Sequence, residues 1–278
     1  MTASTDFSQF PPIAFVGGGN MASAIIGGLI RQGVPASRIT IVEPYEPQRA
    51  QLLQQFGITA LPEATAALAS AQVAVWAVKP QTFKDAAAAV APYTAQALHL
   101  SVAAGIRSES IAQWLNNQHV IRAMPNTPAL VGMGMTALVA RSEVTGAQQQ
   151  LAEQIIATTG QFLWVEQESQ LDAVTALSGS GPAYVFYFLE AMERAGVEMG
   201  LSSEQALKLA IGTFSGASQL AAQSTEPPAV LRERVTSKGG TTFAALESMR
   251  ASNIAAQFIT AIKAADKRAT ELGDEFGR

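Results

Sequence analysis

From residue 11 to about residue 165, short apolar runs alternate with alanine-rich stretches of helical periodicity. The apolar runs have the length and composition of buried strands. They lie at residues 13–16, 39–42, 73–78, 98–102, 120–122, 136–140 and 162–165. Helices are expected at residues 20–32, 48–56, 83–90 and 147–159, and after Ser108. This alternation is typical of successive parallel strands joined by crossover helices, so the sequence predicts an α/β fold with a doubly wound sheet.

Strand patterns stop after about residue 168, and only helical periodicity follows. The expected helices lie at residues 171–177, 182–199, 203–223, 228–236 and 243–272. We therefore predict an N-terminal Rossmann-type domain over residues 1–168 and an all-α domain over residues 169–278. The helix faces are unusually apolar, and residues 211–220 carry small residues at close spacing. These features favour an intertwined dimer formed through the helical domain.

The cysteine and histidine content limits the chemistry of the chain. Among its 278 residues there is no cysteine, and the two histidines are His99 and His119. Disulfides, thiolate metal sites and cysteine nucleophiles are thereby excluded, and we predict no metal site. The formal net charge is -4 and the pI is about 5.3. Because a mildly acidic surface does not attract polyanions, we expect no nucleic-acid partner and no anionic membrane partner.

Three uncharged stretches raise the question of a membrane span, at residues 13–30, 86–106 and 173–189. Each is interrupted by glycine, proline or polar residues, whereas a spanning helix needs about 20 mainly apolar residues. No basic residue precedes Arg31, so the start of the chain lacks the charged region of a signal peptide. We expect a cytoplasmic protein without a membrane partner, whose first ten residues form a loose tail.

A glycine-rich turn directly follows the first predicted strand. Gly17, Gly19 and Ala22 match the pattern G-x-G-x-x-A, which permits a tight turn, close approach of the backbone to a pyrophosphate, and close packing of helix on strand. The following helix begins with Asn20 and Met21, and its N-terminus offers free N–H groups to the phosphates. The turn therefore predicts a nicotinamide dinucleotide cofactor.

Glu43 ends the second predicted strand, where an acidic residue accepts hydrogen bonds from the adenine ribose. A carboxylate at this position favours NADH, because it repels the 2′-phosphate of NADPH. Arg49 lies close enough in the sequence to offer a compensating cation, and Pro44 is placed to turn Glu43 away. The sequence therefore leaves the choice between NADH and NADPH open.

Three further turns follow predicted strands, at residues 77–80, 101–106 and 122–128. Ligands of open α/β sheets bind at the carboxyl ends of the strands, and small residues there leave room for a nicotinamide and its ribose. Two prolines make the third turn rigid and leave Asn126 among its polar groups. The predicted cofactor contacts are Gly17, Gly19, Asn20, Met21, Glu43, Ala77, Val78, Lys79, Pro80, Ala103, Ala104, Gly105 and Asn126.

Two small-residue loops in the helical half precede helices, at residues 178–184 and 235–242. We expect flexible loops whose N–H and hydroxyl groups offer anion sites at helix N-termini. Two such loops in the domain opposite a dinucleotide site favour a second, smaller ligand.

Five motifs together resemble the pyrroline-5-carboxylate reductases in order and spacing. They are GGGNM at residues 17–21, AVKP at 77–80, RAMPNTP at 122–128, SGSGPAY at 178–184 and VTSKGGTT at 235–242. The resemblance covers residues 12–272, and the last motif is the most diagnostic. It implies an oxidoreductase that reduces the C=N bond of 1-pyrroline-5-carboxylate to L-proline with NADPH or NADH, the last step of proline biosynthesis.

The resemblance also implies the substrate site. In the family, the loop that corresponds to residues 237–242 holds the substrate carboxylate. It is supplied by the partner subunit of an interlocked dimer. Many members assemble further into rings of five dimers. Carried over, the substrate-binding residues are Ser180, Ser237, Gly239, Gly240, Thr241 and Thr242. The hydroxyl of Thr242 is the expected catalytic group, in contact with the ring nitrogen. Lys238 departs from the family, in which many members have proline.

The scarcity of histidine and cysteine fits hydride transfer, which needs no protein nucleophile. A cyclic imine takes its proton from water or arrives as the iminium, so rate comes mainly from geometry. One alternative is a β-hydroxyacid dehydrogenase-like enzyme or another imine reductase, with Lys208 or Lys238 as the acid. A second alternative is a non-catalytic NAD(P)-binding sensor.

Overall fold

The computed structural model describes residues 7–276. By its internal contacts the chain forms two compact units. The first comprises Met1–Ser180 with Ala265–Arg278, and the second comprises Gly181–Ala264. We call them the sheet unit and the helical unit, and describe each by itself.

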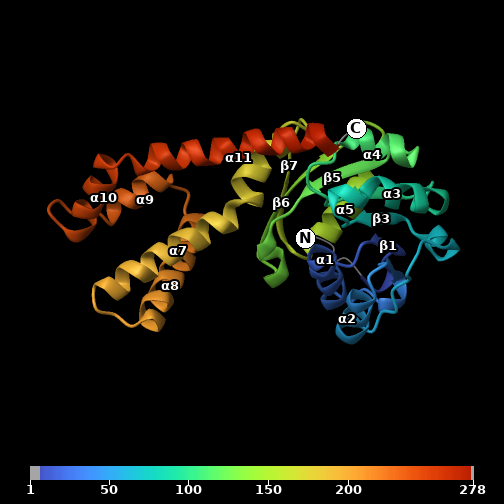
Figure 1. The fold of residues 1–278 in the computed structure, drawn as a ribbon, viewed down its shortest axis with the longest axis horizontal. Helices are drawn as coiled ribbons and strands as arrows, with labels where there is room; N and C mark the ends of the chain where they lie inside the picture. Colours follow the sequence, from blue (N-terminus) through green and yellow to red (C-terminus); the bar gives the residue numbers. More distant parts are fainter. Residues whose placement is uncertain (1–6, 277–278) are drawn as a thin grey trace. The chain divides into compact units, whose positions relative to one another are not determined.

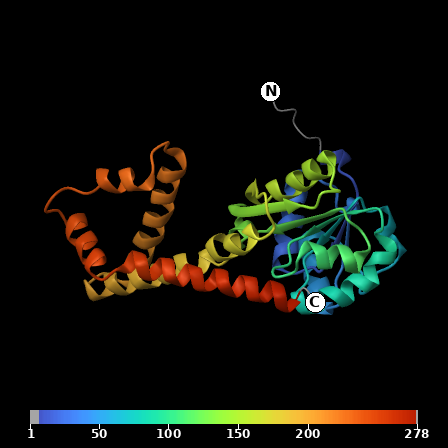
Figure 2. The ribbon, with the colours of Figure 1, turned by 90° about the horizontal axis from the view of Figure 1, so that it is seen from above.

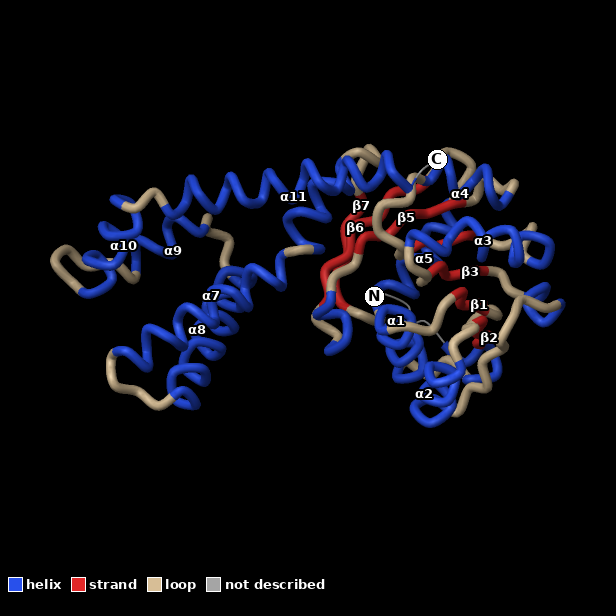
Figure 3. Tube along the Cα trace, viewed as in Figure 1, coloured by secondary structure: helices blue, strands red, loops and turns tan. Residues whose placement is uncertain are grey.

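The sheet unit contains one seven-stranded sheet (Figure 3). Its strands are β1 (Ile13–Val16), β2 (Ile39–Val42), β3 (Val73–Trp76), β4 (Leu98–Ser101), β5 (Val120–Met124), β6 (Gly134–Ala140) and β7 (Gly160–Trp164). Their order in the sheet is β2-β1-β3-β4-β5-β6-β7. The chain therefore reverses its winding between β1 and β3, and this switch point is where open α/β sheets bind ligands.

Helices cover both faces of the sheet (Figure 1). They are α1 (Asn20–Arg31), α2 (Glu46–Phe56), α3 (Pro80–Val90), α4 (Ser108–Leu115) and α5 (Gly146–Ala157). Alternate residues of β1 point to opposite faces: Phe15 packs in the core with α1 and α5, and Val16 in the core with α3 and α4. Since both faces are buried, the strands read as continuous apolar runs. The predicted doubly wound α/β fold is confirmed.

One prediction about the sheet is wrong. The strands were expected to be successively parallel, but β6 runs antiparallel to β5, and β7 then pairs with β6 in parallel. The connection between β5 and β6 contains only the short 3₁₀ segment Thr127–Val131. Because a parallel crossover needs a dozen or more residues, this connection can only return the chain antiparallel.

The helical unit contains α7 (Gly181–Glu198), α8 (Ser203–Gln223), α9 (Pro228–Arg234), α10 (Thr241–Ala251) and the first part of α11 (Ile254–Phe276). Helices α7 and α8 pack side by side (Figure 1), and a capping box of Ser202 and Gln205 begins α8. The single helix predicted over residues 243–272 is wrong. It breaks between α10 and α11, where Asn253 takes a left-handed conformation with φ of 53°.

The boundary between the units differs from the predicted change of domain at residue 168. Helix α6 (Gln170–Val174) and the residues up to Ser180 belong to the sheet unit. The last turns of α11 belong there as well, because this one unbroken helix, red in Figure 2, ends at Phe276 within the sheet unit.

The predicted loose tail over the first ten residues is wrong for its last part. Phe7–Gln9 form a 3₁₀ turn, Phe10 is 3% exposed, and the rings of Phe7 and Phe10 stack. Residues 1–6 lie outside the described residues. Across residues 7–276, the structure has no helix with the length and apolar character needed to cross a membrane.

Candidate functional site

The glycine turn after β1 forms a cradle that a side chain would fill. Gly17 has φ of +92°, and a Cβ atom placed there would lie 2.7 Å from the carbonyl oxygen of Ala77. Its N–H donates to the carbonyl oxygen of Val42 at 2.8 Å. Because the main chains of three strand ends meet at this point, only glycine is compatible with the turn.

Gly19 is the N-cap of α1 and plays a different part. Having no side chain, it leaves the first N–H groups of α1 uncapped, and a Cβ there would meet no atom of the described residues within 4 Å. Asn20, exposed, and Met21, half-buried, are the first residues of the helix. Open space in front of a helix N-terminus at the switch point fits a pyrophosphate, so these residues can hold a dinucleotide.

The other predicted cofactor turns lie at the same edge of the sheet. The Ala77 N–H donates to the Val16 carbonyl at 2.8 Å, and the Val102 N–H donates to the Trp76 carbonyl at 3.0 Å. These bonds continue the parallel ladders and bring the two turns into line with the glycine cradle. The residues of the two turns are Ala77, Val78, Lys79 and Pro80 after β3, and Ala103, Ala104 and Gly105 after β4.

Asn126 connects three segments of the sheet unit. Its Nδ2 atom donates to the carbonyl oxygen and the Oγ atom of Ser178 at 3.3 and 3.1 Å, and its Oδ1 atom accepts from the Met135 N–H at 2.9 Å. A Cβ on Gly179 would lie 2.5 Å from the terminal methyl of Met124. Residues 178 and 179 are thus brought to the motif at residues 122–128 at the carboxyl end of β5.

Residues 178–180 were predicted to be part of a flexible loop, and this prediction is wrong. Thr175–Gly179 form a π-helical turn between α6 and α7, and the Ser180 N–H donates to the Thr175 carbonyl at 2.8 Å. The wider turn presents Ser178 to Asn126. Such π turns are frequent at functional sites.

The loop of residues 237–242 belongs to the helical unit. Its Gly240 N–H donates to the Ser237 carbonyl at 3.0 Å, and Gly239 has φ of +76°, so residues 237–240 form a tight turn. Gly240 is the N-cap of α10 and has no side chain to cap the helix. Ser237, Thr241 and Thr242 are exposed, and with the free N–H groups of the first turn they can bind a carboxylate.

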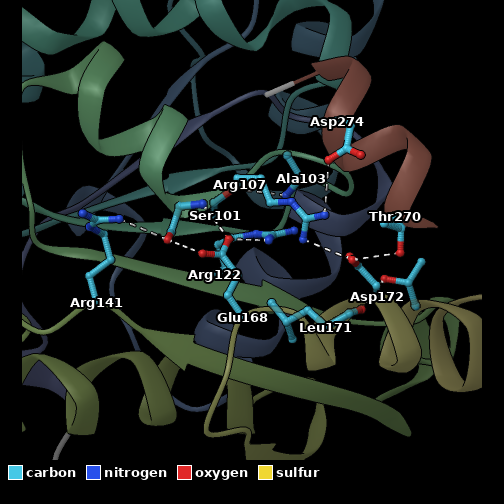
Figure 4. Close-up of polar contacts among 12 residues, drawn as sticks. Ser101, Ala103, Arg107, Arg122, Arg141, Glu168, Leu171, Asp172, Thr270 and Asp274 are labelled. Atoms are coloured by element: carbon cyan, nitrogen blue, oxygen red, sulfur yellow. Dashed lines mark hydrogen bonds and ion pairs between the residues drawn. The ribbon is translucent and has the colours of Figure 1, made fainter. Parts of the chain in front are cut away.

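The sheet unit contains a buried polar network that the sequence did not predict (Figure 4). The guanidinium of Arg122, 6% exposed, donates to Glu168 at 2.5 Å, and the N–H and hydroxyl of Ser108 donate to the same carboxylate. Burial alone raises the pKa of the Glu168 carboxyl, but the charge of Arg122 and the bonds from Ser108 outweigh burial and lower it.

A second ion pair fixes the end of α11 to the sheet unit. Arg107 donates to Asp172 at 3.1 Å, and the hydroxyl of Thr270 donates to the same carboxylate oxygen at 3.3 Å (Figure 4). A Cβ on Gly105 would lie 3.3 Å from the ring of Phe276, so α11 also packs on the turn after β4. Arg122 lies in the motif at residues 122–128, but nothing in the sequence assigned it a partner at residue 168.

Comparisons with known proteins place the chain in a family. A model described as pyrroline-5-carboxylate reductase dimerisation matches residues 168–272, and one described as NADP oxidoreductase, coenzyme F420-dependent, matches residues 12–105. The pyrroline-5-carboxylate reductase of Pseudomonas aeruginosa is 45% identical over 270 residues, which are 96% of this chain and 99% of that protein. The chain belongs to the pyrroline-5-carboxylate reductase family.

Two solved structures of the pyrroline-5-carboxylate reductase family agree with this fold. That of the Coxiella burnetii enzyme has a TM-score of 0.89 and 36% identity, and covers 95% of this chain and 99% of its own. That of the Plasmodium falciparum enzyme, with NADP bound, has a TM-score of 0.83 and 25% identity, and covers 95% and 98%. The predicted family and an NAD(P)-dependent oxidoreductase with a dimerisation domain are confirmed.

Proposed function

We propose that this chain reduces the C=N bond of 1-pyrroline-5-carboxylate to L-proline with NADH or NADPH, as the last step of proline biosynthesis. The observation that carries the proposal is the glycine cradle at the switch point, in a chain that is 45% identical to a named reductase over nearly its whole length. The reaction adds a hydride to the imine carbon and a proton to the ring nitrogen.

The cofactor, when bound, supplies the hydride from C4 of its dihydronicotinamide. The N-terminus of α1, beginning at Asn20 behind Gly19, holds the pyrophosphate through main-chain N–H groups. The turns after β3 and β4 line the same edge of the sheet and would lie beside the nicotinamide ribose. Asn126 holds the turn after β5 against Ser178.

The substrate carboxylate is bound by the turn of residues 237–240 and the N-terminus of α10. Ser237 donates its hydroxyl, and the main-chain N–H groups from Gly239 to Thr242 provide further donors. Ser180 completes the set of substrate residues. The Thr242 hydroxyl hydrogen-bonds the ring nitrogen and orients the imine, so that its contribution is mainly to position the reacting atoms.

The assembly we propose is an interlocked dimer, with rings of five dimers as the larger form, in the cytoplasm. Its support is a set of large apolar side chains exposed on α7 and α8, including Phe186 (58%), Tyr187 (70%), Leu209 (59%) and Ile211 (47%). Gly212 and Gly216 face open space within the described residues, so another chain can approach closely there. A monomeric mass by light scattering contradicts the dimer, and a dimeric mass contradicts the ring.

The reaction is tested with a panel of substrates. Oxidation of NADH and of NADPH is followed in parallel with 1-pyrroline-5-carboxylate and with a cyclic imine that lacks the carboxylate. Reduction of NAD+ and of NADP+ is followed with 2- and 3-hydroxy acids. Turnover of the first compound alone supports the proposal. Preference for a hydroxy acid contradicts it and points to a lysine acid such as Lys208 or Lys238.

A further inference from the structure

The carboxylate of Glu43 is held against the glycine turn. The Gly18 N–H donates to Oε2 of Glu43 at 2.9 Å, and the Tyr45 N–H donates to Oε1 at 2.9 Å. The turn that Pro44 introduces therefore keeps the side chain at the site. Because each carboxylate oxygen is bonded to a main-chain donor, Glu43 cannot rotate away without losing both bonds.

The nearby guanidinium of Arg49 is hydrogen-bonded to the main chain. Nη1 of Arg49 donates to the carbonyl oxygen of Glu43 at 3.1 Å and to that of Pro44 at 2.6 Å. These bonds hold the guanidinium at the backbone of the turn between β2 and α2. Glu46, exposed in the first turn of α2, adds a second negative charge to the same segment.

These contacts bear on the part of a dinucleotide that distinguishes the two cofactors. With the pyrophosphate at the N-terminus of α1, the adenine ribose lies at the end of β2. Each Glu43 oxygen keeps a lone pair for the 2′- or 3′-hydroxyl of that ribose, since a carboxylate oxygen accepts two hydrogen bonds. A 2′-phosphate at the same place puts a charge of about −2 beside the fixed carboxylate, which is unfavourable.

We propose that Glu43 determines cofactor specificity and that this chain prefers NADH to NADPH. The inference rests on the proposed function in so far as the dinucleotide occupies the glycine cradle. Glu43 rejects the 2′-phosphate, and Arg49 stays bonded to the main chain.

The test measures binding without substrate. Wild-type protein is titrated with NADH and with NADPH by nucleotide fluorescence, and ADP-ribose and its 2′-phosphate are used as competitors. We expect NADH to bind at least about tenfold more tightly, a ratio that one unfavourable charge contact readily produces. In Glu43→Gln, most of this ratio is lost, chiefly because NADPH binds more tightly than to wild type.

Two variants provide controls. Glu46→Gln removes a carboxylate from the same segment. Within the described residues this carboxylate is not bonded to the glycine turn, so the variant should leave the ratio unchanged within about twofold. Arg49→Gln should not weaken NADPH binding more than NADH binding. Circular dichroism and thermal melting check that each variant is folded, and the wild-type ratio tests the proposal whether or not a variant folds.

Tighter binding of NADPH by the wild type overturns the proposal, as does an unchanged ratio in Glu43→Gln. Selective loss of NADPH binding in Arg49→Gln also overturns it, because it means that Arg49 binds the 2′-phosphate. Reduction of 1-pyrroline-5-carboxylate with a preference for NADPH contradicts the proposed specificity but agrees with the proposed reaction. NADH-selective binding without reduction of that substrate contradicts the proposed reaction but agrees with the proposed specificity.

Discussion

Two glycines of one turn are required for different physical reasons, and a matched pair of variants separates them. Gly17→Ala forces a side chain into positive φ and against the Ala77 carbonyl, so we expect it to destabilise the fold by about 2 kcal/mol or more. Gly19→Ala has free space and ordinary φ, and should fold normally.

Urea denaturation measures the effect on folding stability, and nucleotide titration measures the effect on cofactor binding. We expect Gly19→Ala to keep its unfolding midpoint and to bind NADH more weakly, because its methyl group occupies the approach of the pyrophosphate. Equal losses of stability in both variants contradict this division of roles.

His99 makes the stability of the protein depend on pH. Its Nδ1 accepts from the indole N–H of Trp76 at 3.1 Å, and burial, aided by the charge of His119 and opposed by the Thr94 backbone, lowers its pKa from 6.5 to about 4. The unfolded chain therefore takes up a proton first as the pH falls below 6.5. The free energy of unfolding should decrease by about 2 kcal/mol between pH 7.5 and pH 5.

The measurement is urea denaturation at several pH values in that window, for wild type and His99→Leu. The variant should lose most of the slope, whatever its absolute stability. An equal slope in both proteins assigns the pH dependence to other groups. The window lies above the range in which Glu168, whose pKa is lowered, begins to lose its stabilising contribution.

For single residues, the sequence predicts the tight turn at Gly17 and Gly19 well, because the spacing of these glycines reflects backbone geometry alone. It does not predict the partners of Asn126 or Glu168, because those contacts join residues 46 to 60 positions apart. Tertiary structure decides such contacts, and the residue types by themselves fit either solvent or a ligand.

The ion pair between β5 and residue 168 should matter far more than those on the surface. Glu168→Gln leaves the buried Arg122 guanidinium without a counter-charge, and we expect a loss of about 2 kcal/mol, less than for a fully buried pair because Glu168 keeps some exposure. Glu275→Gln in the exposed pair with Arg268 should leave the unfolding midpoint unchanged. Comparable losses in both variants contradict the account.

At the scale of elements, the sequence predicts the strands and most helices because apolar runs and caps are local. The reversed direction of β6 was not predictable, because the predicted strands left residues 123–135 between them, just enough for a parallel crossover, whereas β5 and β6 are longer and leave only residues 125–133. The break before α11 was signalled by Asn253, a residue type that tolerates left-handed geometry. The π turn after α6 depends on tertiary contacts and has no such sequence sign.

At the scale of the whole molecule, the proposed dimer places the loop of one chain at the cofactor of the other. We expect complementation between two inactive variants, Gly19→Trp with a blocked cofactor site and Thr242→Ala with an impaired loop. In purified mixed dimers, about half of the sites are intact if the loop acts on the partner, because one of the two sites combines the intact cofactor turn of one chain with the intact loop of the other.

The assay is co-expression with two affinity tags, purification of mixed dimers and measurement of NADH oxidation. Both parental variants serve as backgrounds. Mixed dimers with no more activity than the two backgrounds contradict a loop that is shared between subunits, and place each site within one chain.

The central claim is that the hydride of a nicotinamide cofactor becomes part of proline. It is tested most directly by incubating the protein with 1-pyrroline-5-carboxylate and NADH deuterated at both C4 positions, followed by mass spectrometry of the product. We expect proline that carries one deuterium, formed in step with oxidation of the cofactor. Unlabelled proline, or no cofactor oxidation above the rate without substrate, contradicts it.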